Sequence, residues 1–384
     1  MRITHVLTDS NIGGAGILLE SLLRHTKYKK EGISVILPRG AAMAARYEAL
    51  GVRVLPVLGV PERSFSFEDL SLLCRFLRAD PPDVLHTHAA LSARVAAALV
   101  CPRETVRIAT RHCAYPVGEA GVLWRRIRNR LGERLLSDCT VATARAALDN
   151  LTALGIPPSR VRLIRNGGEA LGRPSREQLS ALRHTLEIPQ GAFVCGMSAR
   201  LAPVKGHETL LRAAKILLSR HTGYHFLLVG GGSEAAKITE LANELGVGAH
   251  LTMVGQVEDV APYTALFDVA VNCSIGTETS CLALSEAMSL SIPCIASRYG
   301  GNPEMVTEGE NGMLFPPKNA PALAAAIERL SCDRALYLHL SRGARARYEC
   351  DLRASVMAAR YDALYTELIA KKRKGEAPAG KRRR

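Results

Sequence analysis

A chain of 384 residues is long enough for two domains, because one hydrophobic core seldom grows past about 250–300 residues. Its composition, with 47% hydrophobic and 22% charged residues, is ordinary for a soluble globular protein. No apolar run reaches the roughly 18–20 residues that cross a bilayer, and the first residues begin a strand without a leader pattern. We therefore expect a cytoplasmic protein.

Ten cysteines are scattered singly and form no Cys-x-x-Cys pair, which indicates buried thiols in a reducing compartment and not a zinc site. The net charge is +14, and half of this excess lies in residues 371–384, with eight basic residues and one acidic residue. Such a tail attracts polyanions, including nucleic acid and anionic lipid. Its glycine, proline and charge content is also typical of a disordered, solubilising end.

Short apolar strands alternate with amphipathic helices almost throughout, a pattern typical of parallel sheets covered by helices. In the first half we expect strands over residues 3–8, 33–37, 52–55, 84–87, 107–110 and 139–142. The helices of this half are expected over residues 16–24, 41–50, 67–79 and 89–100.

A second series of the same kind follows. Its strands are expected over residues 193–198, 225–229, 251–254, 269–274 and 294–297. Its helices are expected over residues 208–219, 234–245, 282–290 and 321–330. The chain between the two series contains several glycines and a proline and is predicted to be a hinge.

We therefore predict an α/β protein with two doubly wound domains that face each other across a cleft. The N-terminal domain covers residues 1–165, the hinge 166–190, the C-terminal domain 191–351 and a basic disordered tail 371–384. A last helix within residues 352–370 has one apolar face and is expected to pack back on the N-terminal domain. Ligands of such sheets bind outside the carboxyl ends of the strands.

The first expected strand leads into a glycine-rich loop, Gly13-Gly14-Ala15-Gly16, followed by a helix. Glycines let the backbone approach a ligand, and the N–H groups at a helix start attract an anion. The spacing is not Gly-x-Gly-x-x-Gly, and no acidic residue ends the next strand convincingly, so a dinucleotide fold is weakly supported. The loop is either a tight turn or a surface for phosphate or sugar.

Two cations, Arg200 and Lys205, follow the first strand of the C-terminal domain and precede a helix. An arginine fork and a mobile lysine charge at this place suit a diphosphate. Exposed basic loop residues without function are the alternative when the pair is taken alone.

Two carboxylates follow the expected strand over residues 269–274: Glu278 in a loop and Glu286 in the next helix. Glu286 lies between the apolar residues Leu284 and Met288, where burial of a carboxylate is costly without a partner. Sugar or ribose hydroxyls would be suitable partners, because an ionised carboxylate accepts two or more hydrogen bonds. An ordinary exposed helix position is the alternative.

This pattern resembles the retaining GT-B glycosyltransferases of the family-4 type. The resemblance rests on Glu278 and Glu286 with seven residues between them, and on the run Gly300-Gly301-Asn302-Pro303-Glu304. Further matches, in the expected order over nearly the whole chain, are Gly13-Gly14, Asn166-Gly167, Arg200, Lys205-Gly206 and Gly312. The resemblance implies two Rossmann-like domains and a nucleotide diphosphate sugar held mainly by the C-terminal domain.

The resemblance also implies roles for individual residues. Arg200 and Lys205 would hold the diphosphate, Glu278 the sugar hydroxyls and Glu286 the ribose. His112, at the end of an N-terminal strand, would face the donor sugar. Further substrate contacts are expected from Gly13, Gly14, His88, Asn166, Gly255, Gln256, Thr279, Ser280, Cys281 and Leu282.

His86 and His88 match a common pattern of the family, although one of them is as well explained as a core histidine without a function. The chain departs from many relatives at three positions. Glycine is frequent at the position of Thr279, an aromatic residue at that of Ser280 and glutamate at that of Gly16. These departures leave the identity of the donor open and do not bear on the activity.

No Asp-x-Asp pair occurs, so we expect neither a divalent metal on the diphosphate nor another cofactor. Arg200, Lys205 and backbone N–H groups near the glycines would then stabilise the leaving group. The resemblance implies that the acceptor hydroxyl attacks on the side from which the leaving group departs, with a phosphate oxygen accepting its proton. Frequency within the family suggests a UDP-sugar as donor.

Residues 122–135 predict a basic amphipathic helix in the N-terminal domain, with five arginines between its apolar residues. Such a helix either lies on an anionic membrane surface or is an ordinary helix with a solvated basic face. Together with the tail over residues 371–384 it suggests peripheral contact with the inner face of the plasma membrane. The acceptor would then be a glycan or lipid-linked glycan of the polysaccharide or lipopolysaccharide type.

Three other functions fit parts of the pattern. A nucleotide-sugar epimerase shares the two-domain fold and would turn over the donor without an acceptor. A nucleic-acid-binding protein would use the basic surfaces, but aromatic residues make up only 5% of the chain and no binding module is recognisable. A protein that binds a sugar nucleotide without catalysis is disfavoured because Arg200, Lys205, Glu278 and Glu286 are all present.

Overall fold

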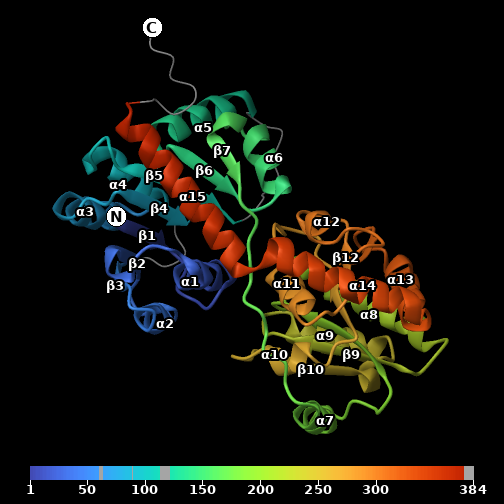
Figure 1. Ribbon diagram of the computed structural model, residues 1–384. Coiled ribbons are helices and arrows are strands. Elements are labelled where there is room, and N and C mark those ends of the chain that lie inside the picture. Colours follow the sequence, from blue (N-terminus) through green and yellow to red (C-terminus); the bar gives the residue numbers. More distant parts are fainter. Residues whose placement is uncertain (60–63, 89, 113–121, 376–384) are drawn as a thin grey trace. The chain divides into compact units, whose positions relative to one another are not determined.

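The computed structural model describes residues 1–59, 64–88, 90–112 and 122–375, with the side chains of residues 122–125 left aside (Figure 1). Contacts divide the chain into two compact units. The first is Met1–Gly167 together with the chain from Ala354, and the second is Gly168–Arg353. Each unit is built on one parallel β-sheet with connecting helices, which confirms the predicted α/β class and the two Rossmann-like halves.

The first unit contains a seven-stranded sheet in the order β3-β2-β1-β4-β5-β6-β7, in which every strand pair is parallel. The order reverses between β1 and β4, as in a doubly wound sheet. Its strands are β1 (Ile3–Leu7), β2 (Ile33–Pro38), β3 (Arg53–Leu58), β4 (Val84–His88), β5 (Val106–Arg111), β6 (Cys139–Ala142) and β7 (Val161–Leu163).

The two faces of this sheet differ because side chains alternate along each strand. On one face Val6 and Leu85 belong to an apolar cluster with residues of α3 and α4. On the other face His86 contacts Tyr365 of α15. The helices of the unit are α1 (Gly14–His25), α2 (Ala44–Glu48), α3 (Phe67–Ala79), α4 (Leu91–Val100), α5 (Val122–Leu136), α6 (Arg145–Ala153) and α15 (Ala354–Arg373).

The second unit contains a six-stranded parallel sheet in the order β10-β9-β8-β11-β12-β13. Its strands are β8 (Phe193–Ser198), β9 (Tyr224–Val229), β10 (Leu251–Gly255), β11 (Val269–Asn272), β12 (Cys294–Ser297) and β13 (Gly312–Phe315). Its helices are α7 (Arg176–Thr185), α8 (His207–Leu218), α9 (Ala235–Glu244), α10 (Ala261–Thr264), α11 (Leu282–Ser289), α12 (Asn302–Met305), α13 (Ala320–Cys332) and α14 (Arg334–Arg347).

The segment predicted as a hinge, residues 166–190, contains the helix α7, and its residues from Gly168 onward belong to the second unit. Ser175 and Gln178 form a capping box that begins α7. Leu179 and Leu182 then pack against the apolar core of that unit. The glycines and the proline that suggested a hinge lie before this helix, so their signal covers only the start of the segment.

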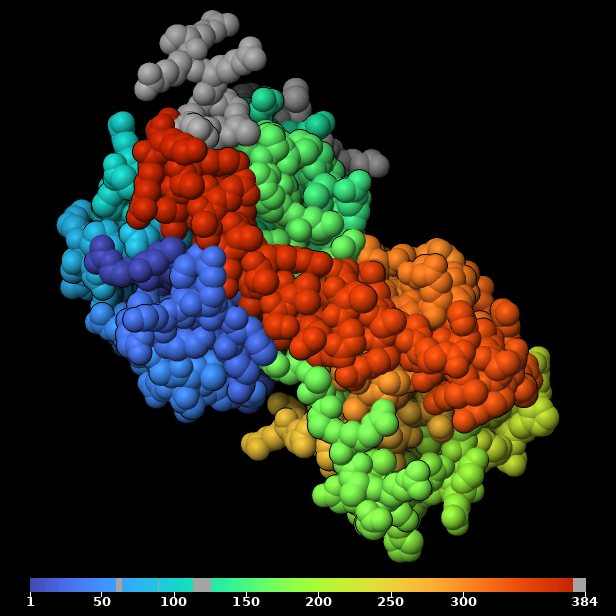
Figure 2. All heavy atoms as spheres, in the orientation of Figure 1, coloured from blue at the N-terminus to red at the C-terminus, as the bar shows by residue number. Residues whose placement is uncertain are grey.

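The predicted disordered tail, residues 371–384, is helical at its start, because α15 continues to Arg373. The Lys372 ammonium lies 2.7 Å from the Asp138 carboxylate and donates to the backbone oxygens of Arg103 and Thr105. Residues 376–384 lie outside the described residues. In Figure 2 the exposed side of α15 (red) lies between blue and green parts of the first unit. The described helices include none with the length and apolar content of a membrane span.

Candidate functional site

The order of strands in the second unit brings together residues that are far apart in the sequence. Strands β8 and β11 are parallel neighbours, so their carboxyl ends lie side by side. Lys205 lies in the short turn after β8, and Glu278 lies in the loop between β11 and α11. The Lys205 Nζ atom is 2.7 Å from Glu278 Oε2. Two residues that the sequence analysis assigned to different parts of the donor therefore form one ion pair.

A polar network supports the Glu278 side chain, which is only 6% exposed. The hydroxyl of Ser274 donates to the same carboxylate oxygen at 2.7 Å. The backbone oxygen of Ser274 accepts from the hydroxyl of Ser297, and the amide of Asn302 bonds both Ser297 and Asn272. The network fixes the position of the carboxylate before any ligand binds.

The ion pair is charged at neutral pH. Burial opposes the ionised form of Glu278, but Lys205 and the hydrogen bonds outweigh it, so the pKa of this carboxyl lies below its ordinary value. For Lys205 burial likewise opposes the charge, and Glu278 outweighs it, so the pKa of the ammonium lies above its ordinary value.

Glycines of the recognised motifs let backbone segments come close around this pair. Gly300 has φ +57°, and a Cβ there would lie 2.0 Å from the backbone oxygen of Glu278. Gly206, which follows Lys205, has φ +71°, and a Cβ there would lie 2.2 Å from the oxygen of Cys273. Thr277, directly before Glu278, is a non-glycine residue with φ +54°, a strained conformation of the kind that clusters at functional sites.

Glu286, on α11, is the opposite case. Its side chain is half-buried, and burial raises the pKa of its carboxyl from 4.5 to about 7. Within the described part of the chain its carboxyl has no hydrogen bond or ion pair. The neighbouring residues Leu284 and Met288 are fully buried. This carboxyl is therefore able to accept hydrogen bonds from a ligand.

The predicted donor residues before α11 lie at the start of this helix. Thr279 and Cys281 are buried, and Ser280 is half-buried. The backbone N–H of Cys281 donates to Met305 Sδ at 3.2 Å, and Leu282 is the first helical residue.

Arg200 is exposed at the carboxyl end of β8, beside a glycine loop, residues 230–232, that the sequence analysis missed. A Cβ at Gly230 would lie 2.2 Å from the backbone oxygen of Ala199, and one at Gly232 would lie 2.3 Å from that of Leu201. The three consecutive glycines after an apolar strand were the available signal.

The predicted substrate residues Gly255 and Gln256 border this glycine loop. Gly255 ends β10 with φ +81° and accepts a hydrogen bond from the N–H of Gly230. The Cβ of Gln256 lies 3.3 Å from where a Cβ of Gly231 would be. The structure thus brings Gly255, Gln256 and Arg200 together at the carboxyl ends of the strands of the second sheet.

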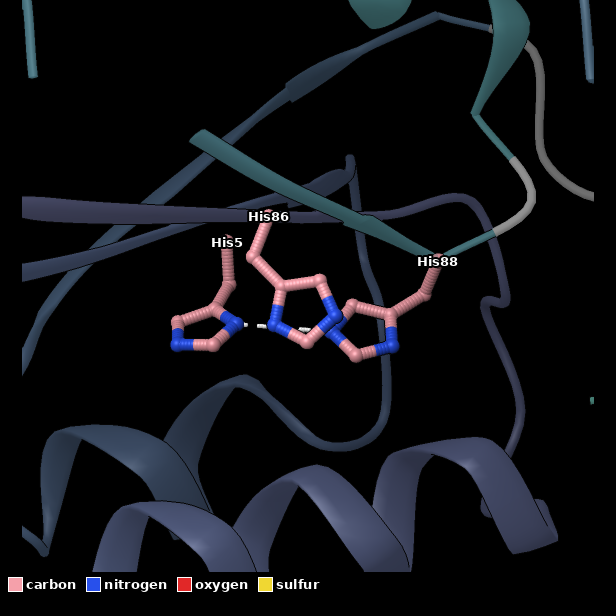
Figure 3. Close-up of side chains that lie close together, drawn as sticks. All are labelled: His5, His86 and His88. Carbon is pink, nitrogen blue, oxygen red and sulfur yellow. Dashed lines mark hydrogen bonds between the residues drawn. The ribbon is translucent and has the colours of Figure 1, made fainter. Parts of the chain in front are cut away.

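The first unit carries the predicted histidines on one face of its sheet. His5 on β1 pairs with His86 on β4, and His88 lies two residues further along β4. His112 follows β5, two residues after Thr110, which pairs with His88. Figure 3 shows the rings of His5, His86 and His88 on the same side of the two strands. His5 is not among the residues predicted from the sequence.

Hydrogen bonds separate these histidines into two groups. His5 Nδ1 lies 3.3 Å from His88 Nε2, and His88 Nδ1 lies 3.0 Å from His112 Nε2. His86 instead bonds hydroxyl groups with both ring nitrogens, Tyr365 at 2.7 Å and Thr110 at 2.7 Å. His86 is therefore satisfied within the core, whereas His88 connects to His112.

His5, His86 and His88 offer ring nitrogens within 4.8 Å of one another, which is close enough to consider a metal ion. Burial lowers the pKa of all three, so they are in the neutral form that binds metals. Both nitrogens of His86 are already engaged by hydroxyls, however, and His5 bonds His88 directly. The contacts therefore favour a hydrogen-bonded cluster.

Three other predicted residues also lie in the first unit. Gly13 caps α1 and Gly14 is its first residue, and a Cβ at Gly13 would lie 2.7 Å from an oxygen of Asp9. Asn166 is buried where the first unit ends. Gly13, Gly14, Asn166, His88 and His112 thus belong to one unit, and all the other predicted site residues belong to the second.

The helix α5 packs through one side and exposes the other. Glu133 on its inner side is 6% exposed and bonds Arg94 and Thr140. Ile127, Leu131 and Leu135, one helical turn apart, are 42%, 54% and 66% exposed. The arginines beside them, Arg126, Arg128, Arg130 and Arg134, are exposed as well. The predicted basic amphipathic helix is therefore confirmed as a helix with an uncovered apolar stripe.

The two units match two family descriptions. Residues 180–347 match "Glycosyl transferases group 1", and residues 12–168 match "Glycosyltransferase Family 4". The chain is a glycosyltransferase of the group 1, family 4 type. The first match includes every strand of the second sheet, and the second match includes strands β2–β7 of the first sheet, so the resemblance stated from the sequence motifs is confirmed over both halves.

Relatives and solved structures agree with this family. An N-acetyl-alpha-D-glucosaminyl L-malate synthase of Bacillus anthracis is 24% identical over 306 residues, 72% of this chain and 79% of the relative. A lipopolysaccharide core biosynthesis glycosyltransferase, LpsE, of Rhizobium meliloti is 28% identical over 205 residues, 53% of this chain and 57% of the relative. The crystal structure of Anabaena HepE in complex with UDP superimposes with a TM-score of 0.82 at 19% identity and covers 96% of this chain and 100% of that one. The same protein has also been solved with UDP-glucose.

Besides the glycine loop over residues 230–232 and His5, sequence reasoning missed the polar residues that support Glu278 in this glycosyltransferase. Asn272 and Ser274 stand at the carboxyl end of an otherwise apolar strand, and this placement was the available signal. Asn302 was quoted only as part of a motif, although its side chain is fully buried and joins two strands.

Proposed function

We propose that this glycosyltransferase transfers a sugar, with retention of anomeric configuration and without a metal ion, from a UDP-sugar to a glycan or lipid-linked glycan. The observation that carries the proposal is the pair of carboxyls in the second unit. Glu278 is charged and fixed by Lys205, and Glu286 is half-buried with a raised pKa and no partner among the described residues.

The donor would use these groups in turn. Glu286 accepts hydrogen bonds from the ribose hydroxyls. These bonds take the place of the hydrogen bonds to water that the carboxylate loses through burial. Arg200 and Lys205 lie after the same strand and supply positive charge to the diphosphate. Glu278 accepts from hydroxyls of the sugar while it keeps Lys205 in place. The UDP and UDP-glucose complexes of HepE, which has the same fold, support uridine as the base.

The proposed chemistry follows from this charge distribution. Arg200 and Lys205 stabilise the departing diphosphate, so no divalent ion is needed. The acceptor hydroxyl attacks on the face from which the diphosphate leaves, so the anomeric configuration is retained. A phosphate oxygen accepts the proton of that hydroxyl. His112, from the first unit, would contact the donor sugar.

The acceptor is proposed from α5. Its apolar stripe of Ile127, Leu131 and Leu135, flanked by exposed arginines, suits the surface of an anionic membrane. A membrane-bound, lipid-linked acceptor of lipopolysaccharide type fits such a surface, and the similarity to LpsE supports it. The enzyme would then be peripheral on the inner face of the plasma membrane.

The activity is tested with a panel of UDP-sugars and short alkyl glycosides in EDTA, with UDP release and the anomeric configuration of the product as readouts. We expect an α-linked product from an α-linked donor, and loss of turnover in Glu278→Ala. A β-linked product or an absolute need for Mg²⁺ would contradict the proposal. Formation of a new UDP-sugar without acceptor would favour the epimerase.

The membrane surface is tested by pelleting with phosphatidylglycerol vesicles. We expect Leu131→Ser to weaken binding about tenfold, because one exposed leucine would lose its burial in lipid. Leu99→Ser is the matched control, since Leu99 on α4 is 68% exposed but lies outside the stripe. Equal binding of both variants, or no binding at low salt, would argue against this surface.

A further inference from the structure

Three imidazoles of the first unit form a continuous hydrogen-bonded series, His5–His88–His112, which we call the histidine row. The two contacts are 3.3 Å between His5 Nδ1 and His88 Nε2, and 3.0 Å between His88 Nδ1 and His112 Nε2. The rings of each contacting pair are inclined by only 24° and 22°. The row crosses the neighbouring strands β1 and β4 and ends directly after β5, so the sheet itself fixes its spacing.

Every ring of the row is neutral at physiological pH. Burial lowers the pKa of His5 to about 3 and that of His112 to about 4. Burial also lowers the pKa of His88 well below its ordinary value, with a further contribution from the neighbouring histidines. A neutral imidazole carries one N–H and one bare nitrogen. Each contact in the row therefore has one donor and one acceptor.

This proton count links the three tautomers. When His88 donates from Nε2 to His5, its Nδ1 is bare and accepts from His112 Nε2. When His5 donates from Nδ1 instead, His88 donates from Nδ1 to His112 Nε2. Any other combination places two protons or two bare nitrogens against each other. All three rings therefore carry the same tautomer, either Nδ1–H or Nε2–H.

We propose that His5 and His88 are positioning residues that fix the tautomer of His112. His112 Nδ1 then carries a proton only when the Nδ1 of His5, two strands away, carries one as well. The functional meaning rests on the proposed function, in which His112 contacts the donor sugar. The linked tautomers themselves follow from the contacts between neutral rings and do not depend on any activity.

The row and a metal site exclude each other. A metal ion bound by His5 Nδ1 and His88 Nε2 needs both nitrogens bare, whereas their hydrogen bond needs a proton between them. His86 would in addition have to give up Tyr365 or Thr110. The protonation of these two nitrogens therefore decides between the two arrangements.

The test is ¹⁵N NMR of the full chain with labelled histidine, because the two ring nitrogens of a neutral imidazole differ in chemical shift according to which one carries the proton. We expect one common tautomer for His5, His88 and His112, unchanged by Zn²⁺ or EDTA. Different tautomers within the row would overturn the proposal. Zn²⁺-dependent shifts at His5, His86 and His88 would overturn it in favour of a metal site.

A variant separates positioning from a structural role. His88→Ala breaks both contacts, so the ¹⁵N shifts of His112 are expected to become the average of two tautomers. His225→Ala is the matched control, because His225 is a buried histidine of the second unit that bonds Thr252. An unchanged His112 tautomer in His88→Ala would overturn the proposal. If His88→Ala does not fold, His5→Ala and the spectrum of the unaltered chain decide.

The activity of the same variant gives the functional readout. We expect kcat of His88→Ala to fall about tenfold with KM for the donor little changed, because misorientation of a contacting group affects the reacting geometry more than binding. If His112 averages between two tautomers in His88→Ala while kcat is unchanged, the positioning role is overturned. Absence of turnover with any donor in the unaltered chain would refute the proposed function and leave the tautomer result standing.

Discussion

The two units keep buried titratable groups in opposite states. In the first unit His5, His88 and His112 are neutral, because burial lowers the pKa of each ring. In the second unit Glu278 is also buried and yet charged, because Lys205 lies 2.7 Å away. Burial alone therefore does not decide the charge of a group. The charge also depends on the partner that the strand order of the sheet places beside the group.

Glu286 belongs to neither case. It lies in the second unit, but burial is the cause that shifts its pKa, as for His5 in the first. A half-buried carboxyl of this kind costs stability in the empty protein, which is reasonable for a group that a ligand will satisfy. The carboxylate of Glu278 is satisfied by groups of the protein, whereas the carboxyl of Glu286 can be satisfied by a ligand.

The largest effect is expected on removing the cation of the pair. Lys205→Ala leaves Glu278 buried without its partner, so the free energy of unfolding should fall by about 3 kcal/mol. Turnover should fall at least about 100-fold, because the charge on the leaving group is no longer stabilised. Denaturant unfolding and UDP release measure the two effects.

The matched control is Arg212→Ala, which breaks the exposed pair with Glu208. That change should cost less than about 1 kcal/mol. The double variant Lys205→Met/Glu278→Met should regain stability but not activity. Equal costs for Lys205 and Arg212 would break the comparison, because the buried pair would then be no different from a surface pair.

A second effect concerns the pH dependence of stability through Glu286. Its pKa is about 7 in the folded chain and near 4.5 in the unfolded chain, so the folded state holds a proton between these values. The contribution of this group is therefore fully present below pH 4.5 and is lost as pH rises through 7. Glu286→Gln should match the unaltered chain near pH 4 and be more stable at pH 8 by up to about 3 kcal/mol.

Thermal unfolding from pH 4 to pH 8 measures this difference. Glu240→Gln, on α9, controls for the loss of a negative charge, since its side chain is exposed. A constant difference between Glu286→Gln and the unaltered chain over the whole range would show that folding does not raise the pKa of this carboxyl.

The smallest effect is expected for the neutral contacts of the first unit. Thr110→Val removes a hydroxyl bonded to His86 at 2.7 Å and should lower the free energy of unfolding by about 1–2 kcal/mol. Thr252→Val removes the similar bond to His225 in a less buried place and should cost less. A cost for Thr110 as large as that for Lys205 would remove the distinction between neutral and charged buried groups.

Much of the fold follows from the sequence, because it depends on local patterns. Apolar runs such as residues 193–198 and 294–297 become β8 and β12 with the predicted bounds. The helix α7 was missed because the glycines and the proline before it dominated the interpretation, although Ser175 and Gln178 signalled its start. Lys372 was assigned to a disordered tail because its partner Asp138 is distant in sequence.

The candidate site was predictable in its residues but not in its contacts. Glu278 and Lys205 could be singled out by motif, whereas their ion pair depends on β8 and β11 being neighbours. His5 gave no signal of its own, since it is one polar residue in an apolar strand. Its importance arises only when β1 pairs with β4 and places it against His86 and His88.

The most direct test of the account measures thermal stabilisation by a UDP-sugar, chosen from a panel in EDTA, at pH 6 and pH 8. Ribose hydroxyls bound to Glu286 favour its ionised form, so the account predicts greater stabilisation at pH 8 than at pH 6 in the unaltered chain. In Glu286→Gln the stabilisation should be weaker and the same at both pH values. Stabilisation that is equal in the two proteins at both pH values, or absent with every UDP-sugar, would contradict the donor site proposed here.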